Sequence, residues 1–312
     1  MPNPNAVHVD TTLTNFSLQY KNEEMIWDKL MPVVKVGKRS EKYWVLDKGQ
    51  RFRKPDDALA ADAMPNEMKV KRSTDNYSVE DHGQAGWVSR EEEDNADTPL
   101  SPMMDQTELN LEVLHLAQEI RVASLVFAAA TYPVGNKVQL AGTSQWGQSA
   151  DDPIGAILTG LDAAFFRPNK IVFGAEAWTV FRRLPEVLDA VKGATRSQGA
   201  GGGLANRSEV ASLFDVDEVL VGRARQNTAN EGQADAYARV WGKHCALLYV
   251  NPNAGNKTVT FGKTFVESKM MTFRNFDGKR GVKGSTHVKT TWNSDEKITA
   301  ADVGYLIQDA VA

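Results

Sequence analysis

The chain has 312 residues, of which 42% are hydrophobic and 24% charged, and this composition is typical of a globular protein with about two compact units. Its formal net charge of −4 argues against a protein whose main task is to coat nucleic acid, since that requires a predominantly basic surface. The single cysteine, Cys245, excludes an intramolecular disulfide and fits a reducing cytoplasm.

Residues 1–32 begin as a polar segment rich in Asn and Thr that follows neither the period of a helix nor that of a strand. We predict an N-terminal arm that ends at Pro32. The segment lacks the basic and apolar regions of a signal peptide. No apolar run in the chain approaches the roughly 20 residues of a membrane-spanning helix, so we expect no contact with a membrane.

Residues 33–90 are rich in charge and contain only short strand-like runs, such as 43–45. The stretch 48–67 has no pattern that would build a core. Loops of this length are uncommon inside a compact domain and are usually functional. We predict an extended two-stranded loop with a polar tip, whose contacts lie outside its own domain.

Residues 91–150 open with an acidic run at 91–97, which we interpret as unstructured, and continue into a long helix. Ser101 and Pro102 are typical of a helix start, and the helix is predicted to extend to about Thr131. One stripe of apolar residues is expected to face the core; its members are Leu109, Val113, Leu116, Ile120, Ala123 and Phe127. The segment 137–150 is rich in Gly, Ser and Gln and predicts a linker.

Residues 151–255 alternate between helical and strand patterns, which predicts an α/β unit. Asp152 and Pro153 are expected to start a helix. A buried strand is predicted at 170–174, followed by helices, and further strands at 218–221 and 237–250. Residues 194–206 hold too many glycines to form an element. From Val259 the pattern becomes β and continues to Ile307.

The residues that usually carry chemistry are scattered. The five histidines do not fall at metal-ligand spacings. His244 and Cys245 are neighbours in a predicted strand and therefore point to opposite faces. The glycines at 199–203 are not followed by the Lys-Ser or Lys-Thr of a phosphate-binding loop. We predict no catalytic, cofactor-binding or metal-binding residue, and no enzyme activity.

Charged blocks are the remaining candidates for function. Basic residues gather at 35–54 and at 274–289, and aromatic residues are interleaved with the basic ones in each block. Either block could therefore bind nucleic acid. Contact between subunits is the favoured interpretation, because complementary charges fix register in symmetric assemblies. The candidate contact residues are Arg51, Arg53 and Lys54 on the basic side and Glu91, Glu92, Glu93 and Asp94 on the acidic side.

Three stretches of the α/β region carry a resemblance to a known family. They read PNKIVFGAEAWTVFRRLPEVLDAVKG, SEVASLFDVDEVLVGRA and RVWGKHCALLYVNP. Together with the order of arm, extended loop, long helix, α/β unit and closing β segment, they resemble the major capsid proteins of tailed bacteriophages, which have the Hong Kong 97 capsid fold. The resemblance covers 152–252 by motif and the rest by layout.

This resemblance implies an α+β, Hong Kong 97-like capsid fold. Its expected parts are an N-terminal arm (1–32), an extended β-hairpin loop that crosses a neighbouring subunit (33–90), a peripheral domain with a long spine helix (91–150), an α/β axial domain (151–255) and a return to the peripheral domain (256–312). The glycine-rich loop, with Gly199, Gly201, Gly202 and Gly203, is expected near the fivefold and quasi-sixfold axes.

By the same resemblance the chain is expected to be a structural protein that self-assembles, as pentamers and hexamers, into the icosahedral head of a phage virion. A separate scaffolding protein, a portal and a decoration protein are the implied protein partners, with packaged double-stranded DNA bound non-specifically on the inner face. Assembly is expected in the cytoplasm of the bacterial host. Two alternatives stay open from the sequence: an encapsulin-like nanocompartment shell, which would share the fold, and an α/β enzyme.

Overall fold

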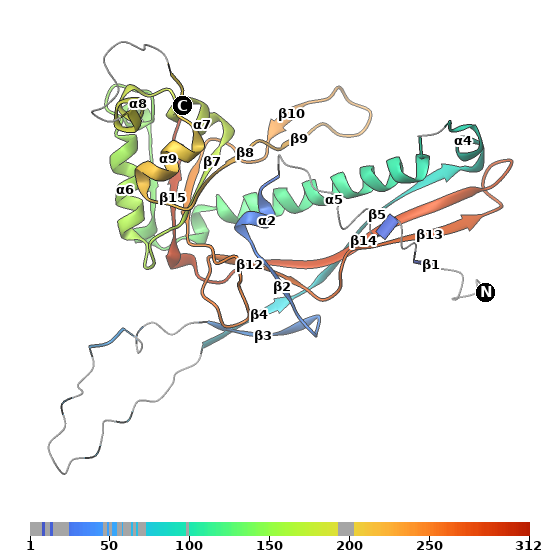
Figure 1. Cartoon of the computed structure of the whole chain (residues 1–312), viewed down its shortest axis with the longest axis horizontal. Helices are drawn as coiled ribbons and strands as arrows, with labels where there is room; N and C mark the ends of the chain where they lie inside the picture. The colour runs from blue at the N-terminus through green and yellow to red at the C-terminus, as the bar shows by residue number, and fades with distance from the viewer. Residues whose placement is uncertain are drawn as a thin grey trace.

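The computed structural model describes residues 8–9, 13–14, 25–45, 49, 52–54, 58, 64, 67, 73–97, 100–192 and 203–312. They form an elongated molecule, with an α/β unit at one end and a long sheet that runs toward the other (Figure 1). None of the described helices combines the length and the apolarity needed to cross a bilayer.

The long sheet is organised around one strand of 14 residues, β14 (Ser285–Ile298). Its strand order is β1-β13-β14-β12-β2, and β5 also pairs with β14. All pairings are antiparallel except that of β2 with β12. The other strands are β1 (His8–Val9), β2 (Val33–Lys35), β5 (Glu80–Ser89), β12 (Gly262–Val266) and β13 (Met271–Asp277).

One long helix, α5 (Pro102–Val126), covers this sheet, with Pro102 in its first turn as predicted. It ends before Thr131, because residues Ala129–Thr131 form a separate 3₁₀ turn, η2. The predicted core stripe is wrong for its first half: Leu109 and Val113 are 54% and 41% exposed. The buried residues of α5 instead include several polar ones; they are Thr107, Asn110, Leu111, Leu114, Gln118, Glu119, Val122, Ala123 and Val126.

The acidic run is a helix, α4 (Arg90–Asn95), and the expectation of an unstructured segment is wrong. Ser89 accepts a hydrogen bond from the Glu92 backbone N–H, and the Glu92 side chain accepts one from the Ser89 N–H. This reciprocal capping box satisfies two backbone donors at the helix start. The Ser-x-x-Glu spacing was present in the sequence and would have predicted the helix.

The α/β unit contains a five-stranded sheet in the order β6-β15-β11-β7-β8. Alternate residues of β7 enter two different cores: Ile171 and Phe173 pack with the helices, while Val172 packs with the end of α5. One sheet therefore joins the two units. Its strands are β6 (Lys137–Gln139), β7 (Lys170–Gly174), β8 (Glu218–Gly222), β11 (Cys245–Leu248) and β15 (Gly304–Gln308), and its helices are α6 (Pro153–Ala163), α7 (Ala175–Phe181), α8 (Pro185–Lys192) and α9 (Arg207–Phe214).

Two predictions for this unit need correction. The linker expected at 137–150 instead supplies β6, which pairs with β15, and Trp146, which is only 2% exposed in the core. The strand β15 lies in the α/β sheet, beside β11, so residues 256–312 do not all return to the long sheet. Short-range composition could not reveal either long-range pairing.

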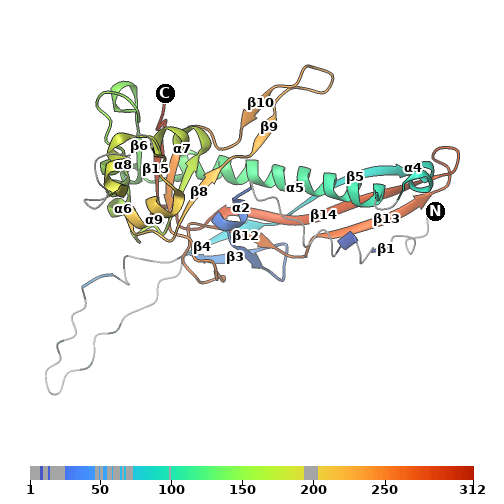
Figure 2. The ribbon, with the colours of Figure 1, turned by 45° about the horizontal axis from the view of Figure 1, so that its top comes forward.

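Two hairpins leave the main body. The pair β9 (Arg225–Asn227) and β10 (Tyr237–Arg239) extends from the α/β unit on the side of α5 opposite the long sheet (Figures 1 and 2). The predicted strand 237–250 is therefore two strands, separated at Gly242, whose φ of +54° favours glycine. The pair β3 (Ser40–Val45) and β4 (Ser73–Ser78) begins the extended loop. The last residues of the predicted extended loop (33–90) lie in β5 and therefore belong to the long sheet.

Candidate functional site: surfaces for subunit contact

The extended loop starts from a compact aromatic base. Tyr43 on β3 and Tyr77 on β4 both pack against Phe265 on β12, with ring centroids 5.3 and 4.6 Å apart. All three side chains are at most 3% exposed. Large buried aromatic side chains dominate the energetics of such contacts, so hairpin β3–β4 is fixed to the long sheet.

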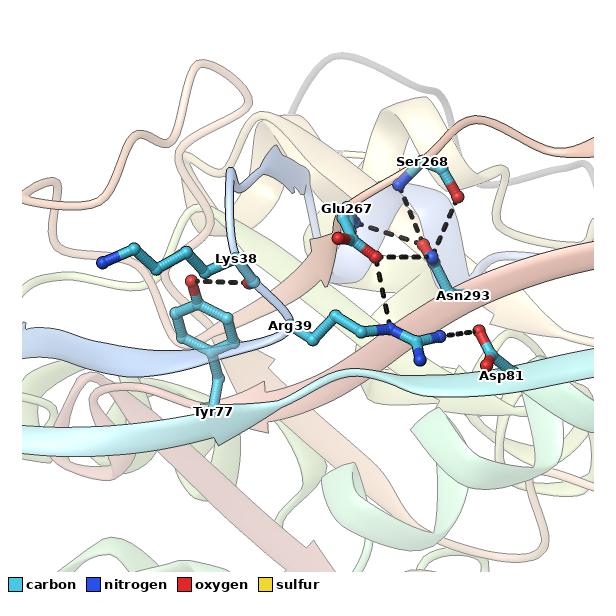
Figure 3. Close-up of polar contacts among 7 residues, drawn as sticks. All are labelled: Lys38, Arg39, Tyr77, Asp81, Glu267, Ser268 and Asn293. Carbon is cyan, nitrogen blue, oxygen red and sulfur yellow. Dashed lines mark hydrogen bonds and ion pairs between the residues drawn. The ribbon is translucent and has the colours of Figure 1, made fainter.

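A polar cluster, drawn in Figure 3, completes this base, and we call the aromatic base and the polar cluster together the hairpin root. Arg39, just before β3, forms ion pairs with Asp81 on β5 and with Glu267 after β12, the latter at 3.3 Å. The Tyr77 hydroxyl donates a hydrogen bond of 3.1 Å to the Lys38 carbonyl oxygen. Arg39 is about half exposed, so these pairs orient the hairpin more than they stabilise the fold.

Asn293 on β14 holds the acidic partner in place. Its side-chain oxygen accepts hydrogen bonds from the backbone N–H groups of Glu267 and Ser268, at 3.2 and 2.9 Å. Its amide nitrogen donates to the Glu267 carboxylate and to the Ser268 hydroxyl, at 3.3 and 2.8 Å. Because Asn293 is 5% exposed, this arrangement gives Arg39 a fixed partner (Figure 3).

The predicted basic contact residues lie beyond the hairpin root. Arg53 and Lys54 are exposed, and Arg51 lies outside the described residues. The neighbouring Phe52 packs edge-on against Phe165, at 4.9 Å between centroids, after the end of α6. The loop therefore also contacts the α/β unit of its own chain, a contact that was not predicted from the sequence.

The predicted acidic residues lie on α4, near the far end of the long sheet from hairpin β3–β4 (Figure 1). Their charge is partly neutralised within the chain, because Arg90 pairs with Glu93 and Asp94 at 3.5 and 3.2 Å. Lys283 also approaches Asp94, at 3.6 Å. Arg90 precedes these carboxylates by three and four residues, a spacing at which helical side chains meet. Glu91 and Glu92 are exposed.

The glycine-rich loop is described only at its end. Gly203 is exposed, and a side chain added there would meet no atom within 4 Å. Gly199, Gly201 and Gly202 lie outside the described residues.

One further site, which was not predicted from the sequence, joins the two units, and we call it the Glu119 junction. Glu119, on α5, is fully buried. Its carboxylate accepts hydrogen bonds from the backbone N–H groups of Ile26 and Trp27, at 3.1 and 2.8 Å, and from the Trp241 indole N–H at 2.5 Å. The segment before α2 (Trp27–Leu30), the spine helix and the turn between β10 and β11 therefore meet at one side chain. The signal in the sequence that could have predicted this site was a carboxylate among the apolar residues of α5.

Burial raises the pKa of Glu119 to about 7, although its three N–H donors favour the ionised form and act in the opposite direction. A second carboxylate, Glu218 on β8, pairs with Lys29 at 2.7 Å and with Lys170 at 3.3 Å. Partial burial acts to raise the pKa of Glu218, but the hydrogen bonds and charges of Lys29 and Lys170 together outweigh it and lower that pKa. The junction and this ion network both attach α2 to the α/β unit.

The described residues contain no cluster of His, Cys, Asp and Glu suited to a metal ion. His244 and Cys245 point apart: His244 Nδ1 accepts a hydrogen bond of 2.9 Å from the Asp309 N–H, while Cys245 lies in the core. Burial raises the pKa of the Cys245 thiol well above its ordinary value, which leaves it a poor nucleophile.

Comparison with known proteins identifies the family. No family model matches the chain. The major capsid protein of Pseudomonas phage JBD67 is 32% identical over 305 residues, covering 97% of each chain, and that of Burkholderia phage BcepMu is 28% identical over 311 residues, covering 96% of this chain and 95% of the relative.

Solved structures agree on the fold. A phage-related protein from Bordetella bronchiseptica superposes with a TM-score of 0.74 at 24% identity and covers 98% of each chain. The capsid of cyanophage P-SCSP1u gives a TM-score of 0.60 at 10% identity, over 93% of this chain and 89% of that one. The α+β fold predicted from the sequence is confirmed. The chain belongs to the phage major capsid protein family, has the Hong Kong 97-like fold and is a structural subunit of the virion capsid.

Proposed function

We propose that copies of this chain assemble as pentamers and hexamers in which the extended loop of one subunit lies across its neighbour. The observation that carries this proposal is the hairpin root. It fixes β3 and β4 to the long sheet through buried aromatic rings and the Arg39 ion pairs, while Arg53 and Lys54 beyond it remain exposed. A rigid base with exposed charge beyond it suits contact with another subunit.

The partner surface we propose is α4 of the neighbour, so that Arg51, Arg53 and Lys54 face the acidic side chains there. Phe52 lies against the α/β unit, whereas α4 lies near the opposite end of the molecule (Figure 1). A contact between these surfaces therefore requires two subunits. The acidic residues of this contact are Glu91, Glu92, Glu93 and Asp94.

Glu91 is expected to contribute most to this contact. Glu92 already caps α4, and Glu93 and Asp94 already pair with Arg90. Glu91 is exposed at the first turn of the helix, so its carboxylate is the one most open to a neighbouring cation.

The glycine-rich loop, with Gly199, Gly201, Gly202 and Gly203, is proposed to lie at the fivefold and quasi-sixfold axes. The α/β unit that carries it lies at one end of the molecule, away from the far end of the long sheet, which supports this assignment (Figure 1). We propose the functional division arm 1–32, extended loop 33–90, peripheral domain 91–150 and 256–312, and axial domain 151–255, with four strands reassigned: β2 and β5 belong to the peripheral sheet, and β6 and β15 belong to the axial sheet.

The remaining proposals concern partners. A separate scaffolding protein, a portal and a decoration protein are proposed to act with the shell, which encloses double-stranded DNA and assembles in the cytoplasm of the bacterial host. We also propose that the protein is not an enzyme. The inert placement of His244 and Cys245 supports this proposal.

The test is a charge reversal with a compensating partner. Arg53→Glu together with Lys54→Glu should leave the subunit folded but reduce the yield of shells, more strongly at low salt, where repulsion is less screened. Each exposed pair contributes only about 0.2–1 kcal/mol, but the contact recurs in every subunit. Adding Glu91→Lys should restore part of the yield. Circular dichroism reports folding, and sedimentation with negative-stain microscopy counts shells.

Lys257→Glu is the control for a charge reversal elsewhere, because it reverses one charge at another exposed position. Normal shell yield from the Arg53/Lys54 reversal would overturn the proposed contact. A loss of yield that Glu91→Lys does not relieve would show that the loop contacts some surface other than α4.

A further inference from the structure

A groove lies on the side of α5 that faces away from the long sheet. It has a volume of about 650 Å³ and is bounded by α5, α7 and the segment from β8 to β9. Leu109, Val113 and Leu116 line its α5 wall, and Trp178 lines the opposite wall. Leu109 and Val113 are exposed, so the groove presents the first half of the apolar stripe on the spine helix to solvent.

Arginines line the same groove, which we call the arginine groove. Arg182 at the end of α7, Arg223 after β8 and Arg225 on β9 all contribute, and Glu112 is the one lining carboxylate among the described residues. No ion pair found among the described residues involves these three arginines, whereas Arg239 nearby pairs with Glu176 at 3.6 Å. The groove therefore has a surplus of positive charge.

Two further observations support this surplus. The Nε atom of Arg182 is buried and has no hydrogen-bond partner among the described residues, and its guanidinium carbon lies 5.7 Å from the centre of the Trp178 ring. Arg207, on α9, has its pKa lowered first by partial burial and then by the nearby charges of Arg223 and Arg182, while Glu218 acts in the opposite direction. A buried donor without a partner costs free energy, and crowded like charges add to that cost.

We propose that the arginine groove binds an acidic, amphipathic helix supplied by a separate protein chain. Its apolar side chains would pack against Leu109, Val113 and Leu116, whose spacings of four and three residues form the ridge that a second helix contacts. Its carboxylates would pair with Arg182, Arg223 and Arg225 in charge-assisted hydrogen bonds. A DNA duplex offers phosphates but no apolar side chains for Leu109 and Val113, so the observations favour a protein partner.

The test uses a synthetic peptide of about four helical turns, with leucines spaced as on α5 and glutamates flanking them. Binding to the full-length protein is measured by fluorescence anisotropy. The comparison probes are a DNA duplex and a glutamine peptide, in which glutamine replaces each glutamate of the acidic peptide. Saturable binding of the acidic peptide, at least about tenfold tighter than of the glutamine peptide, is the expected result. Arg182→Gln with Arg223→Gln should weaken it at least about tenfold.

Two further variants make the result specific. Leu109→Ser removes an exposed apolar contact and should weaken binding of the acidic peptide, while leaving any binding of DNA unchanged. Arg183→Gln is the matched control, because Arg183 is an exposed arginine on the same segment that lies outside the groove. Shell formation is scored separately by microscopy, so that a failure to bind is distinguished from a failure to assemble.

Equal binding of the acidic and glutamine peptides, or no binding, would overturn the proposal. So would DNA binding that depends on Arg182 and Arg223 while the acidic peptide is not held. That outcome would assign the arginine groove to packaged nucleic acid.

Discussion

Replacing Glu119 by Ala is expected to destabilise the protein strongly, because three buried donors lose their shared acceptor. These are the N–H groups of Ile26 and Trp27 and the indole N–H of Trp241. An unpaired buried donor costs about 1–3 kcal/mol, and since the three share one acceptor the costs do not add fully. We expect the free energy of unfolding to fall by about 3–5 kcal/mol, a large part of the roughly 5–15 kcal/mol that is typical of a domain.

The stability should also depend on pH through this residue. The pKa of Glu119 rises from 4.5 to about 7 on folding, so the folded state binds the proton more tightly than the unfolded state. The contribution of Glu119 is therefore greatest below about pH 4.5 and is lost as the pH rises through about 7. At about 1.4 kcal/mol per pKa unit, the change is on the order of 3 kcal/mol. Glu119→Gln should remove this dependence.

The assay is urea unfolding of capsomers at one fixed protein concentration, because association contributes to apparent stability. It is repeated from about pH 5 to about pH 8, across the range in which Glu119 titrates, for the native chain, Glu119→Ala and Glu119→Gln. Glu108→Ala and Glu108→Gln are the matched controls, since Glu108 is exposed on the same helix. The reasoning is refuted if Glu119→Ala lowers the free energy of unfolding by no more than Glu108→Ala does. It is also refuted if the free energy of unfolding of Glu119→Gln depends on pH as steeply as that of the native chain.

Three further predictions follow from packing. Phe265→Ala removes the ring beneath the hairpin root and should cost about 3–5 kcal/mol in thermal unfolding, so a change below about 1 kcal/mol would contradict the proposed anchoring. Gly174→Ala should abolish soluble folded protein, because its Cβ would collide with the Gly242 carbonyl oxygen, whereas Gly37→Ala, with open space around it, should express normally; equal yields would contradict this. Cys245 should resist a thiol reagent in the folded protein and react in denaturant, and rapid labelling without denaturant would show that the core opens.

The α/β unit was predictable because its signals are local. Asp152 accepts a hydrogen bond from the Gly155 N–H at 2.7 Å, as its position before Pro153 predicted. The strand predicted at 170–174 coincides with β7. The motifs of this region also carried the resemblance to phage capsid proteins, and the relatives that match nearly the whole chain confirm it.

The functional surfaces were less accessible to sequence reasoning. Leu109 and Val113 fit a core stripe by spacing, yet they line an open groove, because the buried face of α5 places polar side chains against the long sheet. Asn110, for example, donates a hydrogen bond of 3.2 Å to the Val288 carbonyl oxygen. Periodicity identifies which residues share a face but not what that face contacts.

By itself, the sequence determined the family, the α+β class, the start of the spine helix and most elements of the α/β unit, since caps, turns and short apolar runs act over a few residues. Only the tertiary structure decided that Glu119 joins three separate segments, that β15 enters the α/β sheet and that Arg182 and Arg223 gather in one groove. These features bring together residues far apart in the chain. Their contacts depend on how whole elements pack, and no local pattern encodes that packing.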